Sequence, residues 1–292
     1  MNSFTIKDLE NLSGVKAHTL RIWEQRYRFL KPSRTFTNIR YYSNEELKTI
    51  LNIALLNKYG YKISHIDKMS EDEIRERILS LTQQQAQQER IVNELVKFMV
   101  DLDMESFENT LSSYIVARGI ERTITQIIFQ YLEKVGILWM TNHINPAQEH
   151  LVTNIIRQKL IVGIEGINTP LKSSKSVLLF LPENEYHEIG LLFMYYLLKS
   201  RGVQVVYLGS NVPLADVAFV NNIKKPDYLY CHITRPGQSF QFEKFLNQIT
   251  HKLPTTNCII SGLLTQNYEK KIQPPIVFKR SFAEVMEFIA TL

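Results

Sequence analysis

The chain has 292 residues, of which 45% are hydrophobic and 22% charged, a composition typical of folded globular domains. This length suits two or three domains of about 100–150 residues each. No apolar run approaches the roughly 18–20 residues that span a bilayer, and Met1–Lys7 lacks the regions of a secretory signal. The two cysteines, Cys231 and Cys258, have no metal-ligand spacing. We therefore expect a reduced, cytoplasmic protein and no membrane partner.

The positive charge of the chain is concentrated near its N-terminus. The net charge is +5, yet the segment from Lys16 to Arg40 alone holds seven basic residues and one acidic residue, Glu24. Aromatic residues, among them Trp23, Tyr27 and Phe36, lie between these basic residues. A basic face is often only solvated, but basic and aromatic side chains together favour a surface that binds phosphates.

The first elements have the order of a winged helix-turn-helix. Residues 4–12 carry apolar side chains at helical spacing, Ser13-Gly14 interrupts them, and 15–27 resumes the pattern. Two short helices around a glycine turn are typical of this motif. Residues 34–42, rich in β-branched and aromatic side chains, predict a small wing.

A helical region follows the wing. Residues 43–59 and 63–69 predict two helices, and the glutamine-rich segment 83–88 suits either a flexible linker or an exposed connecting helix. Asp103, Gly119 and Asn145-Pro146 then mark the starts of further helices. The stretch to about residue 166 predicts a four-helix bundle.

Beyond Lys172 short apolar runs alternate with helical segments, which predicts a parallel, doubly wound, flavodoxin-like (Rossmann-like) α/β domain. The fold class is therefore multidomain: an all-α winged helix-turn-helix, a four-helix bundle and a five-stranded parallel sheet. The expected domains are 1–75, a linker or connecting helix at 76–90, the bundle at 91–168 and the sheet domain at 173–292. The expected strands are 177–181, 203–208, 228–233, 258–261 and 276–278. The helices expected after the first strand are 187–200, 214–224, 240–251, 267–271 and 282–291.

Several N-terminal motifs fall in the order and spacing of one family. They are Gly14-Val15, Thr19-Leu20-Arg21, Trp23-Glu24-Gln25-Arg26-Tyr27, Lys31-Pro32, Arg34 and Arg40-Tyr41-Tyr42-Ser43. Residues 3–72 resemble the MerR family of transcription regulators, which implies binding to a double-stranded DNA operator by a nucleoid-associated protein. Small polar and cationic side chains suit base edges and phosphates. The expected DNA-binding residues are Lys16, His18, Thr19, Arg21, Arg26, Tyr27, Arg34, Arg40 and Tyr42. For Glu24 we favour an ion pair or a cap inside the domain, an alternative that also applies to Arg26.

A histidine follows the first expected strand of the sheet domain, where parallel sheets bind ligands. The motif Glu185-x-His187-x-x-Gly190 resembles the cobalamin-binding domains of methionine synthase and B12-dependent mutases. That resemblance implies His187 as the lower axial ligand of cobalt and Glu185 as the partner that orients its imidazole. It also implies that Gly190 lets the following helix begin close to the corrin.

A second pattern lies at the end of the bundle: Trp139, nine residues, then Glu149-His150. It resembles the CarH/LitR photoreceptors, MerR regulators that sense light through adenosylcobalamin. This implies that Trp139, Glu149 and His150 shield the upper face of the corrin. It also implies an oligomeric repressor, a homodimer or homotetramer, that responds to light. The alternative is that Trp139 is a core aromatic and Glu149-His150 an exposed first turn.

The chain departs from these families at several positions. His232-Ile233-Thr234 stands where a Ser-x-Leu or Ser-x-Thr is usual, and Ser261-Gly262 where a glycine pair is usual. His232, Thr234, Ser261 and Gly262 are therefore candidate cofactor-binding residues that change the pocket for the nucleotide tail. Met140 stands where the CarH/LitR family has a histidine after the tryptophan, a role for which His143 is a candidate substitute.

Two other functions remain open. The first is a MerR-type regulator whose degenerate B12 fold serves oligomerisation or another effector, which His232 and Ser261 favour. The second is a B12 enzyme or methyl carrier, but the chain has no room for a substrate-holding barrel and shows no Ser-His-Asp or paired-carboxylate arrangement. We therefore expect a regulator and not an enzyme.

Overall fold

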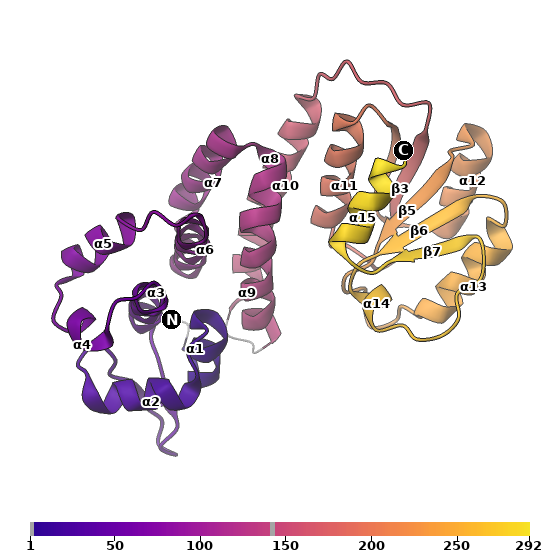
Figure 1. Ribbon diagram of the computed structural model, residues 1–292. Coiled ribbons are helices and arrows are strands. Elements are labelled where there is room, and N and C mark those ends of the chain that lie inside the picture. The colour runs from indigo at the N-terminus through magenta and orange to yellow at the C-terminus, as the bar shows by residue number, and fades with distance from the viewer. Residues whose placement is uncertain (1–2, 141–143) are drawn as a thin grey trace. The chain divides into compact units, whose positions relative to one another are not determined.

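The computed structural model describes residues 3–140 and 144–292 and forms two compact units, 1–155 and 156–292 (Figure 1). The boundary falls within one helix, α10 (Pro146–Glu165). Among the described residues, no helix is long and apolar enough to cross a membrane.

The helix-turn-helix forms where its sequence signals predict it. Thr5 and Asp8 form a reciprocal capping box at the start of the first helix. Gly14, with φ of 75°, ends that helix in the left-handed conformation that glycine adopts without strain. The helices up to the bundle are α1 (Ile6–Ser13), α2 (Ala17–Arg26), α3 (Asn44–Lys58), α4 (Ile63–Ile66) and α5 (Glu71–Leu79).

The wing is a two-stranded antiparallel ribbon, β1 (Ser33–Arg34) and β2 (Arg40–Tyr41). An isolated antiparallel bridge joins Phe4 to Tyr42, and both side chains are buried. The wing is thereby fixed to the beginning of the chain. A second capping box, between Ser43 and Glu46, starts α3 directly after it.

Helix α5 was missed in the sequence, although Ser70 and Glu73 form a capping box that signals its start. The glutamine run belongs to the first turns of α6, so the helical alternative is correct and the flexible linker is wrong. The bundle helix also begins earlier than the predicted residue 91. Its helices are α6 (Gln84–Asp101), α7 (Met104–Arg118), the consecutive α8 (Ile120–Thr123), η1 (Ile124–Ile128) and α9 (Phe129–Met140), and α10 (Pro146–Glu165).

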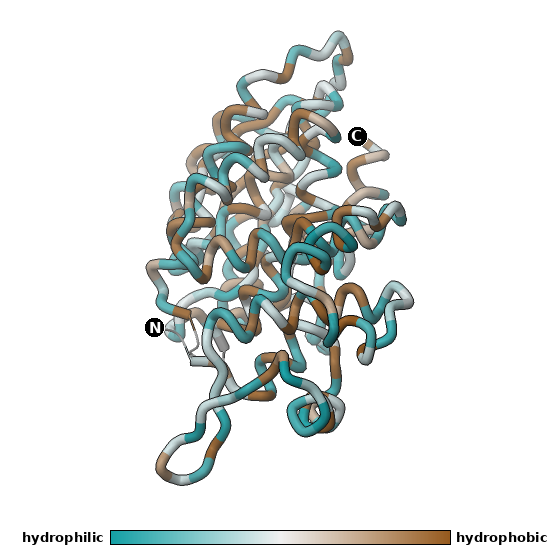
Figure 2. The backbone as a smooth tube through the Cα atoms, turned by 90° about the vertical axis from the view of Figure 1, so that its left-hand side faces the viewer, coloured by the Kyte–Doolittle hydropathy of each residue, from teal (hydrophilic) through white to brown (hydrophobic). Residues whose placement is uncertain are grey.

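Hydrophobic and hydrophilic residues alternate along the helices of the chain (Figure 2), and many of the apolar residues of the bundle are buried in its core. A polar contact joins this bundle to the helix-turn-helix. The Lys134 ammonium of α9 donates to the Leu12 carbonyl at the end of α1 (2.9 Å) and to Asn93 Oδ1 of α6 (2.8 Å). A cation at a helix C-terminus is favourable, yet burial lowers the pKa of Lys134 to about 8.

The second unit contains a parallel sheet of five strands within residues 144–292, in the order β4-β3-β5-β6-β7. Helices α11 and α15 cover one face, and α12 and α13 cover the other (Figure 1). This is the predicted doubly wound, flavodoxin-like arrangement. The strands are β3 (Ser176–Pro182), β4 (Gln204–Val212), β5 (Tyr228–His232), β6 (Asn257–Ser261) and β7 (Ile276–Lys279). The helices are α11 (Ile189–Ser200), α12 (Leu214–Lys224), α13 (Phe242–Lys252), α14 (Leu263–Gln266) and α15 (Phe282–Ala290).

One predicted helix of this unit is wrong. Residues 267–271 are not helical; the helix of this region is α14, which begins immediately after Gly262. Gly262 has a φ of 102° and turns the chain at the end of β6. Its carbonyl then accepts from both the backbone N–H and the hydroxyl of Thr265, which closes the helical turn early.

We predict that Lys134→Met changes how the stability of the first unit depends on pH. Lys134 deprotonates near pH 8 when folded and near its ordinary value of about 10.4 when unfolded. Between these values the unfolded state binds more protons, so the free energy of unfolding of the wild type rises by at most about 1.4 kcal/mol per pH unit relative to the variant. Urea unfolding between pH 7 and 9.5, followed by tryptophan fluorescence, measures this because Trp23 and Trp139 both lie in this unit.

The exposed Lys68 is the control. Lys68→Met should differ from the wild type by a constant amount across the same pH range. A Lys134→Met difference that is equally flat would contradict a buried ammonium at this contact.

Candidate functional site

The predicted DNA-binding residues of α2 extend from its N-cap to its C-cap and differ in exposure. Lys16 stands at the N-cap, and its Nζ lies 3.5 Å from Glu10. His18, Arg21 and Arg26 are exposed, whereas Thr19 and Tyr27 are half-buried, and Trp23 packs inward as expected. Lys16, Arg21 and Arg26 thus place positive charge on the surface of this helix.

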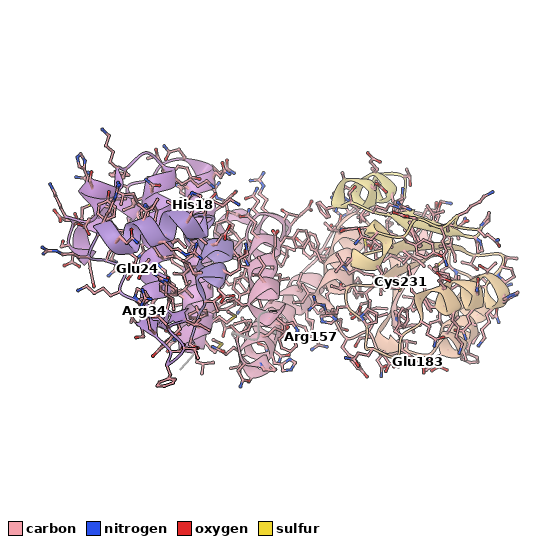
Figure 3. All side chains as sticks on the ribbon, turned by 90° about the horizontal axis from the view of Figure 1, so that it is seen from below. His18, Glu24, Arg34, Arg157, Glu183 and Cys231 are labelled. Atoms are coloured by element: carbon pink, nitrogen blue, oxygen red, sulfur yellow. The ribbon has the colours of Figure 1, made fainter. Side chains whose placement is uncertain are left out.

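The two wing arginines are held by Glu24 of α2. Arg40 Nε lies 2.7 Å from Glu24 Oε2, and an Arg34 guanidinium nitrogen lies 3.4 Å from Glu24 Oε1. Glu24 and Arg34 lie side by side in the helix-turn-helix (Figure 3). Glu24 therefore makes the ion pair that the sequence favoured, and it fixes the wing against the helix.

The prediction that Tyr42 contacts DNA is wrong. Its side chain is 0% exposed, and its hydroxyl has no hydrogen-bond partner. The reason is the bridge to Phe4, which draws the end of the wing into the core. An alternating aromatic pattern cannot distinguish a buried tyrosine from an exposed one at this position.

In the second unit, the functional candidates gather at the carboxyl ends of β3 and β5. These strands are neighbours in the sheet, and the connections leave them toward opposite sides, to β4 and to β6. Ligands of doubly wound sheets bind at such a switch point. Glu185 and His187 follow β3, while His232 and Thr234 end or follow β5.

The Glu185 carboxylate links these two loops. It is fully buried, and its Oε2 accepts from the backbone N–H groups of Thr234 and Arg235, at 2.9 Å each. Its Oε1 accepts from the backbone N–H of His187 (2.9 Å) and pairs with His187 Nδ1 at 2.6 Å. Burial raises the pKa of Glu185, but the hydrogen bonds from His187 and Thr234 lower it more, and the net shift is downward.

An ionised carboxylate can only accept hydrogen bonds, so the proton of the His187 imidazole lies on Nδ1. The lone pair is then on Nε2, and the His187 side chain is 49% exposed. This is the arrangement in which a carboxylate orients a histidine for a metal. The sequence predicted this pair, but not Arg235, whose contact is made by backbone and leaves no side-chain signal.

The acidic residue after His187 makes a contact that the sequence did not predict. Glu188 Oε2 lies 2.7 Å from Arg157 Nε of α10, and Glu188 Oε1 accepts from the Tyr207 hydroxyl of β4 at 2.7 Å. The hydrogen bond to Glu188 and the Glu188 charge raise the pKa of Arg157. Arg157 is 31 residues away in the chain, so no local pattern could indicate the pair.

His232 and Ser261 lie on adjacent strands, paired in register. His232 Nδ1 is 2.8 Å from the Ser261 hydroxyl, which is 2.6 Å from the buried Tyr230 hydroxyl. Burial lowers the pKa of His232 to about 4. Gly262 approaches the backbone of Ile233 so closely that a Cβ would lie 2.3 Å from its carbonyl oxygen. Ser261 and Gly262 thus make contacts within the protein.

Gly190 lies against His232, and its expected role beside a corrin stays a prediction. A Cβ at Gly190 would lie 2.5 Å from His232 Cδ2. Glycine is therefore required at this position, because the His232 ring occupies the space that a side chain would need.

In the first unit, Trp139 lies one residue before the end of α9, and Glu149-His150 lies in the first turns of α10. Trp139 is 38% exposed, in contrast with the 6% of Trp23. Glu149 Oε2 is 3.3 Å from His150 Nδ1, and His150 is exposed. Burial, and to a smaller extent the Glu149 charge, raises the pKa of Tyr131 in α9. His143 lies outside the described residues.

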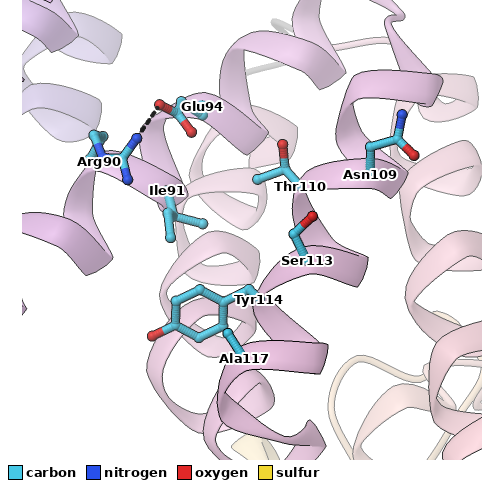
Figure 4. Close-up of a pocket in the computed structure, with 8 residues that line it drawn as sticks. All are labelled: Arg90, Ile91, Glu94, Asn109, Thr110, Ser113, Tyr114 and Ala117. Atoms are coloured by element: carbon cyan, nitrogen blue, oxygen red, sulfur yellow. Dashed lines mark hydrogen bonds and ion pairs between the residues drawn. The ribbon is translucent and has the colours of Figure 1, made fainter. Parts of the chain in front are cut away.

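A separate shallow pocket of about 380 Å³ lies on the bundle between α6 and α7 (Figure 4). Its lining includes the Arg90–Glu94 ion pair of α6 and the Ser113 and Tyr114 side chains of α7. The residues predicted for DNA or cofactor binding lie elsewhere.

We predict that Glu185→Gln lowers the free energy of unfolding of the second unit by about 1–3 kcal/mol at pH 7, because an amide cannot accept all four hydrogen bonds. Since folding lowers the pKa of Glu185, this stabilisation is present above the unfolded pKa and is lost as the pH falls through the folded pKa. Urea unfolding followed by circular dichroism, at pH 7 and again below pH 4, measures the difference.

Glu183, exposed in the same loop (Figure 3), provides the matched control. Glu183→Gln should leave the stability within about 0.5 kcal/mol of the wild type. Equal effects of the two substitutions would remove Glu185 as the residue that holds the loops together.

Comparisons with known proteins agree with this geometry. Residues 4–73 match the family described as MerR HTH family regulatory protein, and residues 68–162 match the family described as B12 binding domain. The second match covers the helical bundle.

Two characterised relatives align with most of the chain. The HTH-type transcriptional repressor CarA of Myxococcus xanthus is 25% identical over 270 residues, which cover 91% of this chain and 89% of CarA. The HTH-type transcriptional repressor CarH of the same organism is 26% identical over 259 residues, 86% of each chain. These relatives are repressors and not enzymes, as expected for this chain.

Among solved structures, the monomethylamine corrinoid protein of Methanosarcina barkeri has a similar fold. The TM-score is 0.53 at 13% sequence identity, with 70% of this chain and 99% of the other covered. The chain is therefore a MerR-type transcriptional regulator that joins a helix-turn-helix domain to a B12-binding domain and is a distant homologue of the CarA and CarH repressors.

Proposed function

We propose that this regulator is a repressor whose binding to a double-stranded operator is controlled by a corrinoid, with His187 as the protein ligand of cobalt. The observation that carries the proposal is the Glu185–His187 pair at the switch point of the sheet. The proposed place of action of the regulator is the cytoplasm, on the nucleoid.

The donor set suits the lower face of a corrinoid. Glu185 pairs with His187 Nδ1, which leaves Nε2 as the ring nitrogen that would ligate cobalt. The backbone N–H groups of Thr234 and Arg235 keep that carboxylate ionised and in place. When bound, adenosylcobalamin supplies a cobalt–carbon bond that light can break.

The bundle supplies the other set of proposed contacts. Trp139, Glu149 and His150 shield the upper face of the corrinoid, as the resemblance to the CarH/LitR photoreceptors implies. The exposure of Trp139, at the end of its helix, supports this role over that of a core aromatic.

Two polar contacts can carry the state of the site to the DNA-binding helices. Glu188, next to His187, pairs with Arg157 of α10, the helix that also carries Glu149 and His150. Lys134 of α9, five residues before Trp139, bonds to the end of α1. If a change of ligand state displaces α9 or α10, the contact made by that helix is stretched. The same contact stays intact in the ligand state that leaves the helix in place.

Assembly completes the proposal. The adenosyl form favours a homodimer or homotetramer that grips the operator, because an oligomer combines weak contacts. Illumination then releases the DNA.

On the DNA side, α2 is the helix that enters the major groove. Lys16, His18, Thr19 and Arg21 approach base edges and phosphates, and Arg26 and Tyr27 the flanking backbone. The wing arginines approach phosphates while Glu24 holds them at a fixed register.

A second function has one observation in its favour. The His232 imidazole sits against Gly190 and bonds to Ser261, so this edge of the sheet is closely packed as it stands. A regulator that uses the sheet domain only for oligomerisation or another effector would have such an edge. Binding of no corrinoid would favour this function.

We predict that Arg21→Ala weakens binding to duplex DNA of about 30 base pairs. It should also reduce the slope of log K against log salt concentration by about one, because one phosphate contact is lost. Tyr42→Phe should leave both quantities unchanged, since the hydroxyl is buried and makes no hydrogen bond. Fluorescence anisotropy over a range of salt concentrations measures both. An unchanged salt slope for Arg21→Ala would place the contacts elsewhere.

We predict that the full-length protein binds adenosylcobalamin or adenosylcobinamide in the dark and that His187→Ala abolishes the shift in the visible spectrum that imidazole ligation causes. His251→Ala, an exposed histidine of α13, should retain it. Absorption spectra before and after illumination provide the measurement. If neither corrinoid binds, the proposed ligand is wrong, whereas binding without any effect of His187→Ala removes only the ligand assignment.

A further inference from the structure

The space beside Gly190, at the carboxyl edge of the sheet, is filled by the His232 ring. A Cβ on Gly190 would lie 2.5 Å from Cδ2 and 2.6 Å from Nε2 of His232, distances that carbon atoms do not tolerate. Gly190 is three residues after His187, in the first turn of α11. The His232 imidazole therefore occupies the floor beside the proposed cobalt ligand.

Hydrogen bonds hold this imidazole in position. The Tyr230 hydroxyl, almost fully buried, lies 2.6 Å from Ser261 Oγ. Ser261 Oγ in turn shares a hydrogen bond with His232 Nδ1, at 2.8 Å. If His232 swings out, the buried Ser261 hydroxyl loses this partner, which is unfavourable.

The turn after the neighbouring strand is fixed as well. The turn at Gly262 lies against the backbone of Ile233, where a Cβ would be 2.3 Å from the carbonyl oxygen. The Ile233 N–H donates to the Ser261 carbonyl at 2.9 Å. The loop after β6 cannot move aside without breaking this contact, so it does not move in place of His232.

Corrinoids differ in the group that this floor would have to accept. Complete cobalamin carries a bicyclic aromatic base on a nucleotide tail attached to the corrin edge. When a protein histidine ligates cobalt from below, this base is displaced but stays tethered on the same side. Cobinamide, which lacks the nucleotide, makes no such demand.

We propose that His232 excludes the nucleotide base, so that this protein binds corrinoids without a bulky lower base in preference to complete cobalamin. The inference rests on the proposed function, because it concerns which corrinoid His187 receives. A base larger than imidazole cannot share the space beside Gly190 with His232. It must expel the ring and break the bond to Ser261.

The test is equilibrium dialysis of the full-length protein, in the dark, with adenosylcobinamide and adenosylcobalamin in parallel. The wild type should bind adenosylcobinamide roughly ten- to hundredfold more tightly, the cost of one lost buried hydrogen bond. His232→Ala should raise the affinity for adenosylcobalamin by about tenfold or more and change that for adenosylcobinamide by less than about twofold. His251→Ala should leave both affinities unchanged.

Ser261→Ala provides a second variant that keeps the imidazole but removes its hydrogen-bond partner, and it should reduce the preference without abolishing it. Equal affinities of the wild type for the two corrinoids would overturn the inference, as would an unchanged ratio in both variants. Those results leave the corrinoid-controlled function standing. Failure to bind either corrinoid, in contrast, overturns the proposed function itself.

Discussion

The buried carboxylate of Glu185 is the interaction on which the second unit's edge depends. It accepts four hydrogen bonds, two from the loop after β3 and two from the loop after β5. A buried charge is stable only when it is satisfied in this way. Glu185 binds the loops after β3 and β5, the two strands between which the strand order reverses. The same carboxylate sets the tautomer of His187. One carboxylate therefore both holds the two loops together and orients the His187 imidazole.

The first unit is organised around contacts of the same kind. Lys134 places a cation at the carbonyl end of α1, where the helix dipole favours it, and Asn93 accepts a second hydrogen bond from it. Glu24 fixes the wing to α2. In both cases a charge of one element is satisfied by another element, so the helix-turn-helix and the bundle have a defined relation within this unit. Regulation by a ligand needs such defined contacts, because a loosely attached domain cannot report a change.

The space beside Gly190 is filled by this chain's own His232. Ser261 and Tyr230 link the His232 ring to a buried chain of hydrogen bonds. His232 is visible in the sequence, but its consequence depends on which atoms it meets across the sheet.

The sequence alone determined the helix-turn-helix, the strands and the Glu185–His187 pair, because capping residues, glycine turns, apolar periodicity and a spacing of two are local signals. Local patterns also misled, as with residues 267–271, where the turn at Gly262 moved the helix forward. Only the tertiary structure decided that Tyr42 is buried, that Glu24 holds the wing arginines and that His232 packs on Gly190. Each of these depends on residues brought together from distant parts of the chain, and such contacts are set by packing, which no local pattern encodes.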